Sequence, residues 1–489
     1  GGNASFVVSA GDQIQTTKKK SPGKSEMTSE IEYTGYLSPD VLKSLPVATT
    51  VGNHDADNAN YTYHFNTPNS SDLGSNGVVG GDYYFTYGNT LFMMLNTQDT
   101  NAAEHKQFME QAIAANPNCT WRVVTLHQDI YGSAEHSNEP EITNLRYTLV
   151  PYFEANDVDV VLTGHDHAYS RTHILEGGHK TVEYTDDEFD AELDKDMDAG
   201  ENPATRYEAP ANISADSKEP ADVAYLNYLN AVMDKDAVED TEKGETVVNP
   251  DGILYMTANS SSGSKYYDLV PRMQSYIANR WQEDVPTYSV IDVTDNTFTI
   301  NTYRTDNDQK IDETFTIKKG VTEDIKSASV GKVKNQVYTG KQIQPALKVT
   351  LNGKTLKAGK DYTVTYADNK NTGLAKATIN GTGKYTGTQT VTFKIVPEKA
   401  VLKTVKTGKS GTATVTIGKA GGKVSGYAIQ VSTDSSFKKV TTYRTAKTTY
   451  TLKNLSKGKT YYVRVKAFTK VSDKNVYGAA SKTIKVKAK

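Results

Sequence analysis

Short apolar runs that end in a glycine or a polar side chain constrain the fold of this chain more than any other feature of its sequence. The clearest run is residues 158–163, which lead directly into Gly164-His165-Asp166-His167. A short β-branched run followed by glycine is typical of a buried parallel strand that breaks into a tight turn. Similar runs occur at residues 6–10, 47–51, 91–95 and 121–126.

Helix-like segments separate several of these predicted strands. Residues 102–115 and 142–155 each carry apolar side chains at helical spacing. Strands that alternate with helices predict a layered α/β domain with a largely parallel sheet. Such sheets bind ligands beyond the carboxyl ends of their strands, and two histidines two residues apart on one turn suit a pair of metal ions. The candidate side chains at these ends are Asp12, Asn53, His54, His127, His165 and His167.

The polar turns form four motifs in a fixed order. They are Gly11-Asp12, Gly52-Asn53-His54-Asp55, Val124-Thr125-Leu126-His127 and Gly164-His165-Asp166-His167. This set resembles the motifs of the calcineurin-like metallophosphoesterases, and the following Ala168-Tyr169-Ser170-Arg171 resembles the purple acid phosphatase branch. The resemblance spans about residues 1–318 and implies a layered β-sandwich with flanking helices. Four unrelated turns on an α/β protein without a metal are the alternative.

The resemblance implies a dinuclear site for divalent or trivalent metal ions, such as iron, zinc or manganese. Asp12 matches the carboxylate that bridges the two metals. Asn53, His127 and His165 match the other ligands of one metal, and His167 matches a ligand of the second. The implied reaction is in-line attack of a metal-bound hydroxide on the phosphorus of a phosphomonoester.

Four further residues have roles that the resemblance implies or leaves open. His54 matches the non-ligating histidine that protonates the leaving alkoxide or steadies the phosphate, and its neighbour Asp55 could orient that imidazole. His136 lies in a loop that carries substrate-facing histidines in the resembling branch, although a solvent-exposed histidine is an equal alternative. Arg171 could reach a phosphate, but we favour a role in bracing the turn beneath the ligands.

Two departures from the family pattern affect the metal site. The family has an aspartate-bearing motif on an earlier strand, but only eleven residues precede Asp12. We therefore expect the chain to be a fragment that lacks the first strand and one ligand of the second metal. Gln15 stands where purple acid phosphatases have an iron-binding tyrosine, so we expect a colourless site with other metals.

Residues 181–250 form an acidic insertion with 20 Asp and Glu against 5 Lys and Arg, a net charge of −15. It has little apolar periodicity outside residues 223–233, so a solvated, partly mobile excursion is expected. Acidic runs at residues 186–188 and 194–198 could be calcium ligands, but they lack the spacing of an EF-hand loop. Negative charge of this size beside an anion site disfavours nucleic acid as a substrate.

The C-terminal third has short alternating strands with frequent turn signals, which are typical of β-sandwich modules. Residues 327–397 resemble bacterial immunoglobulin-like repeats, and residues 398–489 resemble a fibronectin type III module. The second module has 21 Lys and Arg against 3 Asp and Glu, a net charge of +18. It could bind anionic cell-wall polymers or present an ordinary solvated face. Its lysines lack a stacking platform for nucleic acid, and no segment reaches the length of a membrane span.

These observations predict a metallophosphoesterase domain over residues 1–320 followed by two all-β sandwich modules. We expect a bacterial, secreted or cell-surface phosphatase, with its placement inferred from the C-terminal modules because one cysteine does not reveal the compartment. A nucleotidase or phosphodiesterase of the same superfamily is one alternative. The other is a surface adhesion protein whose phosphoesterase domain is inactive.

Overall fold

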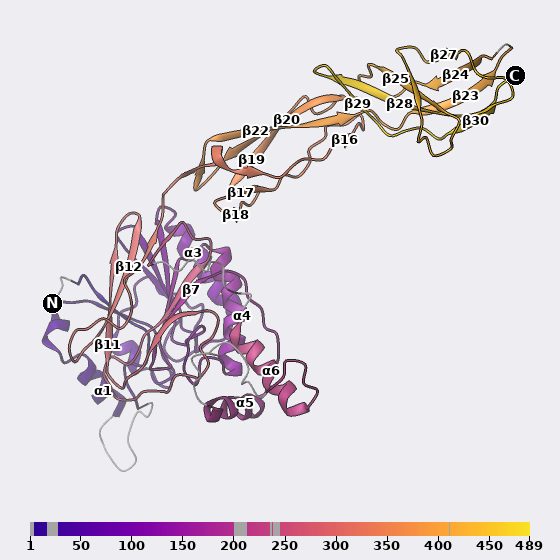
Figure 1. The fold of residues 1–489 in the computed structure, drawn as a ribbon. Helices are drawn as coiled ribbons and strands as arrows, with labels where there is room; N and C mark the ends of the chain where they lie inside the picture. Colours follow the sequence, from indigo (N-terminus) through magenta and orange to yellow (C-terminus); the bar gives the residue numbers. More distant parts are fainter. Residues whose placement is uncertain (1–3, 17–27, 200–212, 235–236, 238–244, 410) are drawn as a thin grey trace. The chain divides into compact units, whose positions relative to one another are not determined.

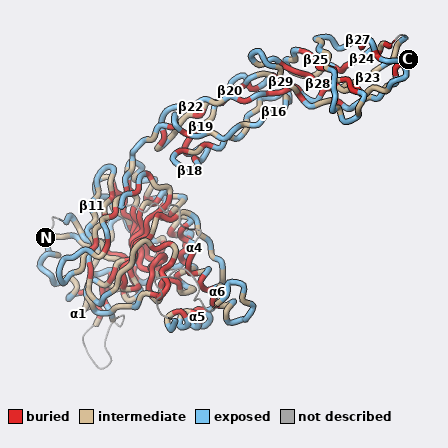
Figure 2. The backbone as a smooth tube through the Cα atoms, viewed as in Figure 1, coloured by how far each residue is buried: buried red, intermediate tan, exposed pale blue. Residues whose placement is uncertain are grey.

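The computed structural model describes residues 4–16, 28–199, 213–234, 237, 245–409 and 411–489. The chain divides into two compact units, Gly1–Gly320 and Val321–Lys489, each with its own buried interior (Figures 1 and 2). None of the described helices is both long and apolar enough to span a bilayer.

Within the described residues, the main sheet of the first unit has seven strands. In spatial order they are β10 (Ile277–Trp281), β7 (Tyr169–Leu175), β9 (Ile253–Thr257), β6 (Val160–Thr163), β5 (Trp121–Thr125), β4 (Thr90–Met94) and β3 (Tyr83–Tyr87). The four central strands, β9, β6, β5 and β4, are parallel. Strands β3, β7 and β10 pair antiparallel at the two sides. The parallel centre was predicted, whereas the antiparallel margins were not.

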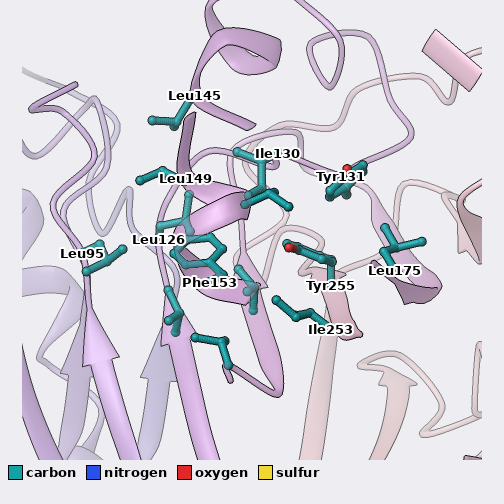
Figure 3. Packing of buried hydrophobic residues seen from close by; sticks show 14 of the residues in the cluster. Leu95, Leu126, Ile130, Tyr131, Leu145, Leu149, Phe153, Leu175, Ile253 and Tyr255 are labelled. Atoms are coloured by element: carbon teal, nitrogen blue, oxygen red, sulfur yellow. The ribbon is translucent and has the colours of Figure 1, made fainter. Parts of the chain in front are cut away.

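Helices α3 (Ala102–Ala115) and α4 (Pro140–Ala155) cover one face of this sheet. Pro140 lies in the first turn of α4, where its missing N–H is not needed. Apolar side chains from both helices and from the sheet form one buried cluster, in which Leu149 and Phe153 of α4 face Leu126 of the β5 end (Figure 3). Burying large apolar side chains in this way contributes about 1.5–3 kcal/mol each.

A second sheet covers the opposite face, in the order β11 (Thr287–Val293), β12 (Thr297–Arg304), β13 (Phe315–Lys318) and β8 (Thr246–Val248). Phe298 and Ile300 of β12 pack against Trp121 and Val123 of β5 in a separate buried cluster. The unit therefore has a helix layer and two packed sheets. This arrangement confirms the predicted layered α/β fold.

Strands β1 (Val7–Ser9) and β2 (Val47–Thr49) form a separate parallel pair. The Thr50 hydroxyl, just after β2, donates to the carbonyl oxygen of Leu95 after β4 at 2.8 Å. This bond places the carboxyl end of the pair beside the same end of the main sheet. The remaining helices near this pair are α1 (Thr28–Tyr36), the 3-10 helix η1 (Asp40–Lys43) and α2 (Asn60–His64).

The acidic insertion contains two helices, α5 (Asp186–Ala199) and α6 (Pro220–Met233). They enclose a buried cluster of their own that includes Phe189, Tyr228 and Met233. The expectation of a solvated excursion is therefore wrong for α5 and α6, and the acidic runs at 186–188 and 194–198 lie on a helix rather than on a calcium-binding loop. Residues 200–212, 235–236 and 238–244 of the insertion lie outside the described residues.

The second unit consists of short strands and one 3-10 helix within its described residues, as the sequence predicted. Over residues 321–397 they are β14 (Glu323–Asp324), η4 (Ile325–Ser327), β15 (Ser329–Val330), β16 (Gln336–Val337), β17 (Val349–Leu351), β18 (Lys354–Thr355), β19 (Tyr362–Ala367), β20 (Gly373–Gly381), β21 (Tyr385–Thr386) and β22 (Thr388–Val396). Over residues 398–489 they are β23 (Val401–Thr407), β24 (Ala413–Gly418), β25 (Gly426–Ser432), β26 (Thr441–Thr445), β27 (Thr449–Leu452), β28 (Thr460–Val471), β29 (Lys474–Tyr477) and β30 (Ile484–Lys487). Separate apolar clusters fill the two halves.

Candidate metal centre

Side chains from four strand ends converge on one atom, Nε2 of His127. The Oδ1 atom of Asn53 lies 3.0 Å from this nitrogen, and Oδ2 of Asp12 lies 3.1 Å from it. Nδ1 of His165 lies 3.2 Å away. These residues follow β2, β1 and β6, while His127 follows β5, so the topology gathers donors from four separate segments of the chain.

The turns that carry these side chains have a backbone conformation that few residues adopt. The φ angle is +52° at Asp12, +70° at His165 and +43° at His167. Residues other than glycine in this region cost on the order of 1–3 kcal/mol each, and such strain concentrates at functional sites. The surrounding fold therefore holds three of the predicted ligands in strained turns.

Two glycines permit the close approach of the turns. A Cβ atom on Gly11, where φ is +96°, would lie 2.4 Å from Nδ1 of His127. A Cβ atom on Gly52 would lie 2.1 Å from Oδ1 of Asp12. Neither position has room for a side chain, which explains the glycine in each motif.

The donor set fits a bound cation. Nδ1 of His127 lies 2.8 Å from the carbonyl oxygen of Ala10, so we assign the ring proton to Nδ1, which donates to that carbonyl. Nε2 then presents a lone pair to the oxygens of Asn53 and Asp12, which are acceptors as well. A proton could satisfy only one of these contacts at a time, whereas a metal ion can contact every donor. Nitrogen and oxygen ligands of this kind suit zinc, manganese or iron.

Electrostatics at the centre favour the ligating forms of Asp12 and His165. Burial raises the pKa of Asp12, but the neighbouring His127 outweighs burial and lowers it to about 2. Burial, together with the charge of His127, lowers the pKa of His165 to about 3. Burial lowers the pKa of His127, but Asp12 outweighs this effect and raises it. A metal ion must therefore compete with a proton at His127, whereas Asp12 and His165 are already deprotonated.

His167 lies beside this group without sharing its central atom. Its Nδ1 atom lies 3.0 Å from the carbonyl oxygen of Lys265, which leaves Nε2 as the ligating nitrogen. One group of at least three acidic, imidazole or thiol side chains has its ligand atoms within 4.8 Å of one another in the described part of the chain: Asp12, His127 and His165. A second metal held by Asp12 and His167 stays a prediction.

His54 and Asp55 do not pair through their side chains. The backbone N–H of His54 donates to Oδ1 of Asp12 at 2.9 Å, and its buried Nδ1 atom has no hydrogen-bond partner among the described residues. The Asp55 carboxylate accepts from the Tyr33 hydroxyl at 2.8 Å and from the Gly52 N–H at 3.0 Å. The structure thus gives Asp55 a role in bracing the Gly52 turn, and a catalytic role for His54 stays a prediction.

Comparison with known proteins identifies the domain that carries this group. Residues 1–169 match the calcineurin-like phosphoesterase family, and this range includes all five predicted metal ligands. The first unit contains a calcineurin-like phosphoesterase domain. The prediction from the four motifs is confirmed.

Individual relatives of the phosphoesterase domain are distant. An uncharacterized protein of Mycobacterium tuberculosis is 26% identical over 156 residues, which cover 27% of this chain and 29% of that protein. The chain thus matches less than a third of this relative's length. A purple acid phosphatase from seeds of yellow lupin (Lupinus luteus) is similar with 13% identity and a TM-score of 0.42, over 65% of this chain and 47% of the lupin chain.

The C-terminal module has matches of its own. Residues 402–483 match the fibronectin type III domain family. The sixth fibronectin type III domain of a human fibronectin type III domain containing protein is 21% identical, with a TM-score of 0.16 over 19% of this chain and 85% of that domain. The predicted C-terminal fibronectin type III module is confirmed, and the immunoglobulin-like assignment of residues 327–397 stays a prediction.

His136 lies at the margin of the phosphoesterase centre. Its ring centroid is 5.8 Å from that of His165, and its Nδ1 atom lies 2.6 Å from Oε1 of Glu139. The hydrogen bond with Glu139 raises the pKa of His136. The structure therefore places His136 beside one of the ligands, and a role in facing the substrate stays a prediction.

Two buried carboxyl groups connect the loops of the phosphoesterase centre. The Ser137 hydroxyl lies 2.5 Å from Oδ2 of Asp129 and 2.7 Å from Oδ2 of Asp166. Burial raises the pKa of both carboxyl groups, and the nearby charge of Asp129 raises that of Asp166 further. The backbone N–H of His136 also donates to Oδ1 of Asp166 at 3.2 Å. This network fixes the His136 loop against the His165 turn.

Arg171 lies away from the converging side chains. Its Nε atom lies 2.6 Å from Oδ2 of Asp312, and its guanidinium lies over the ring of Phe315 at 4.6 Å. Tyr169 donates to the same Asp312 carboxylate at 2.7 Å. These contacts support the bracing role that we favoured, and they commit the Arg171 side chain to the interior rather than to a phosphate.

Sequence reasoning missed a tyrosine that contacts two of the site histidines. The ring of Tyr267 lies 4.4 Å from that of His136 and 5.0 Å from that of His167, centroid to centroid. Tyr267 is in the loop after β9, which is parallel to β6. A polar loop after another parallel strand was the available signal, because its start also lies at the carboxyl edge of the sheet.

Proposed function

We propose that this chain is a metal-dependent phosphoric ester hydrolase that acts on phosphomonoesters. The observation that carries the proposal is the convergence of Asp12, Asn53 and His165 on Nε2 of His127. The match of residues 1–169 to the calcineurin-like phosphoesterases supports a hydrolase of this general class.

In this proposal Asp12, Asn53, His127 and His165 hold one metal, and Asp12 and His167 contribute to a second. Metal ions bound there would activate water and offset the negative charge of the phosphoryl group. The carbonyl oxygens of Ala10 and Lys265 fix the rings of His127 and His167, and therefore which nitrogen each presents.

His54 is the proposed proton donor to the leaving alkoxide. Its backbone N–H is held by Asp12, while its imidazole has no protein hydrogen-bond partner at Nδ1 among the described residues. Because Nδ1 is enclosed in the protein, the proposal assigns the transferred proton to Nε2 of His54. A general acid of this kind contributes on the order of 10²–10⁴-fold in rate.

The test is hydrolysis of an aryl phosphate by the full chain, with zinc, manganese and iron supplied in turn. We expect metal-dependent turnover that falls on the order of 10²–10⁴-fold in a His54→Ala variant that still binds the metal. His179→Ala, at an exposed histidine of the same unit, is the matched control. A wild-type protein that binds metal but hydrolyses no phosphate ester would overturn the proposal.

The same assay separates the proposed phosphatase from its alternatives within the superfamily. An aryl monoester, an aryl diester and a nucleoside monophosphate are compared at equal concentration. Preference for the diester would indicate a phosphodiesterase, and preference for the nucleotide would indicate a nucleotidase.

The C-terminal module supports a second proposal, that the protein is extracellular and attached to the surface of a bacterial cell. Residues 402–483 match the fibronectin type III family, and residues 398–489 have a net charge of +18. This charge suits anionic cell-wall polymers. Loss of binding to purified cell wall after deletion of residues 398–489 would support this attachment, and unchanged binding would refute it. If binding is lost and wild-type catalysis is also absent, the chain is an adhesion protein with an inactive domain.

A further inference from the structure

The loop that follows β9 in the phosphoesterase domain lies against both the His167 turn and the His136 loop. Near its start, Oδ1 of Asn259 lies 3.4 Å from Nε2 of Gln282, which also donates to the His167 carbonyl at 2.5 Å. Near its end, the Val270 N–H donates to the Ser133 carbonyl at 3.1 Å. The loop that contains Lys265 and Tyr267 is therefore anchored beside both histidines.

Tyr267 fills the space between these histidines. Its ring meets the ring of His136 edge-on, at an interplanar angle of 86°, and is tilted by 41° against the ring of His167. Aromatic pairs in such arrangements are worth about 0.5–1.5 kcal/mol each beyond the area they bury. Tyr267 thus forms one wall of the centre.

Lys265 places a positive charge on this wall. Its Nζ atom lies over the Tyr267 ring, 4.3 Å from the centroid, and also contacts the Tyr267 hydroxyl. Its backbone carbonyl is the hydrogen-bond partner of His167. The side chain is exposed, and no carboxylate of the described residues lies within ion-pair distance of it.

The other cations near the loop already have ion-pair or hydrogen-bond partners. Arg272 forms a buried ion pair with Asp196 at 3.0 Å. Arg171 is paired with Asp312 at 2.6 Å, and Arg280 donates to the Val270 carbonyl at 2.6 Å. Lys265 is therefore the cation of this loop region that is exposed and available to an anionic ligand.

We propose that Lys265 is a substrate-binding residue that recognises the dianionic phosphoryl group of a monoester, with Tyr267 as the positioning residue that holds its ammonium group beside His167. This assignment rests on the proposed function. A phosphomonoester carries two negative charges at neutral pH and a diester carries one. An ammonium group that faces the phosphoryl oxygens consequently favours the monoester.

The test compares Lys265→Met and Lys265→Arg with wild type in the full metal-loaded chain. An aryl phosphate monoester and a bis-aryl phosphate diester are the substrates, and binding of inorganic phosphate is measured by calorimetry. Lys265→Met should lower kcat/KM for the monoester and weaken phosphate binding by roughly 10-fold to 100-fold, with a smaller loss for the diester. Lys265→Arg should retain most of the monoester kcat/KM and most of the phosphate affinity, because arginine retains the positive charge.

One control and one further variant separate recognition from structural damage. The control, Lys43→Met, removes one charge from η1, which precedes the amino end of β2 and so lies away from the carboxyl edge. It should leave kcat/KM unchanged for both esters. Tyr267→Phe keeps the ring and removes the hydroxyl, so it should raise KM for the monoester with little effect on kcat or on metal content.

The outcomes distinguish this assignment from the proposed function. An active wild-type protein whose Lys265→Met variant keeps the same monoester-to-diester ratio and the same phosphate affinity would overturn the role of Lys265 alone. A metal-loaded wild-type protein that hydrolyses neither ester would overturn the proposed function and this assignment with it.

Discussion

Nδ1 of His127 lies 2.8 Å from the carbonyl oxygen of Ala10, although 117 positions separate the two residues in the sequence. This contact joins the end of β5 to the end of β1 and turns Nε2 of His127 towards Asp12 and Asn53. A backbone carbonyl that fixes a histidine ring is a recurrent feature of metal sites, because it selects the ligating nitrogen.

Replacement of His127 tests this centre. His127→Ala removes the atom on which the other donors converge, so we expect metal affinity to fall by more than roughly 100-fold, beyond the effect of losing an outer partner. Calorimetric titration with zinc or manganese measures the change. The exposed His179→Ala serves as control and should bind as wild type does; equal affinity in both variants would mean that the metal binds elsewhere.

Gly52→Ala tests the packing of the turns. A Cβ atom there would lie 2.1 Å from Oδ1 of Asp12, so the carboxylate must move and metal affinity should fall by at least roughly 10-fold. Gly35→Ala on α1, whose Cβ would meet nothing within 4 Å, is the matched control and should stabilise the first unit by about 0.4–1 kcal/mol. A Gly52→Ala protein with wild-type affinity would refute the tight approach.

Asp55→Asn tests the buried carboxyl group beneath the Gly52 turn. Burial, followed by the charge of Asp12, raises the pKa of Asp55 from 3.8 to about 7. Between these values the native protein keeps a proton that the unfolded chain releases. The free energy of unfolding should therefore decrease as pH rises through this window, by up to about 1.4 kcal/mol per pH unit from this group.

The measurement for Asp55 is urea unfolding with a metal chelator present, at several pH values within that window. Both tryptophans, Trp121 and Trp281, lie in the first unit, so their fluorescence reports its unfolding alone. The stability of wild type minus that of Asp55→Asn should fall towards higher pH. Parallel curves for the two proteins would show that Asp55 titrates normally.

Arg272→Met tests the attachment of the acidic insertion. Nε of Arg272 lies 3.0 Å from Oδ1 of Asp196, with side chains 2% and 3% exposed. Removing one partner leaves a buried charge without compensation, which costs about 3–5 kcal/mol. The double variant Arg272→Met with Asp196→Leu should recover much of this loss. Urea unfolding followed by tryptophan fluorescence checks both, and an additive double variant would contradict the ion-pair account.

The sequence was sufficient to predict the elements whose packing partners are set by the order of the strands and helices. Residues 102–115 were predicted as a helix and form α3 with the same bounds. The predicted metal ligands follow strands whose carboxyl ends meet at one edge, so their convergence required only the order of the strands. The strand ends and the candidate ligands could thus be identified together.

Elements stabilised by distant partners could not be predicted in this way. Strand β7 was not predicted: it includes the polar residues Ser170, Arg171 and Thr172, and Arg171 pairs with Asp312, which lies 141 positions away. Helix α5 has few apolar residues, and its Phe189 becomes buried only against α6. The partners of His167 and Tyr267 also come from loops whose contacts no local pattern specifies.

The most direct test of the metal centre is the position of a bound ion in crystals of the metal-loaded protein, found by anomalous X-ray scattering. We predict one ion within about 2.0–2.2 Å of Oδ2 of Asp12, Oδ1 of Asn53, Nε2 of His127 and Nδ1 of His165. An ion bound elsewhere while these four side chains keep their mutual contacts would contradict the account.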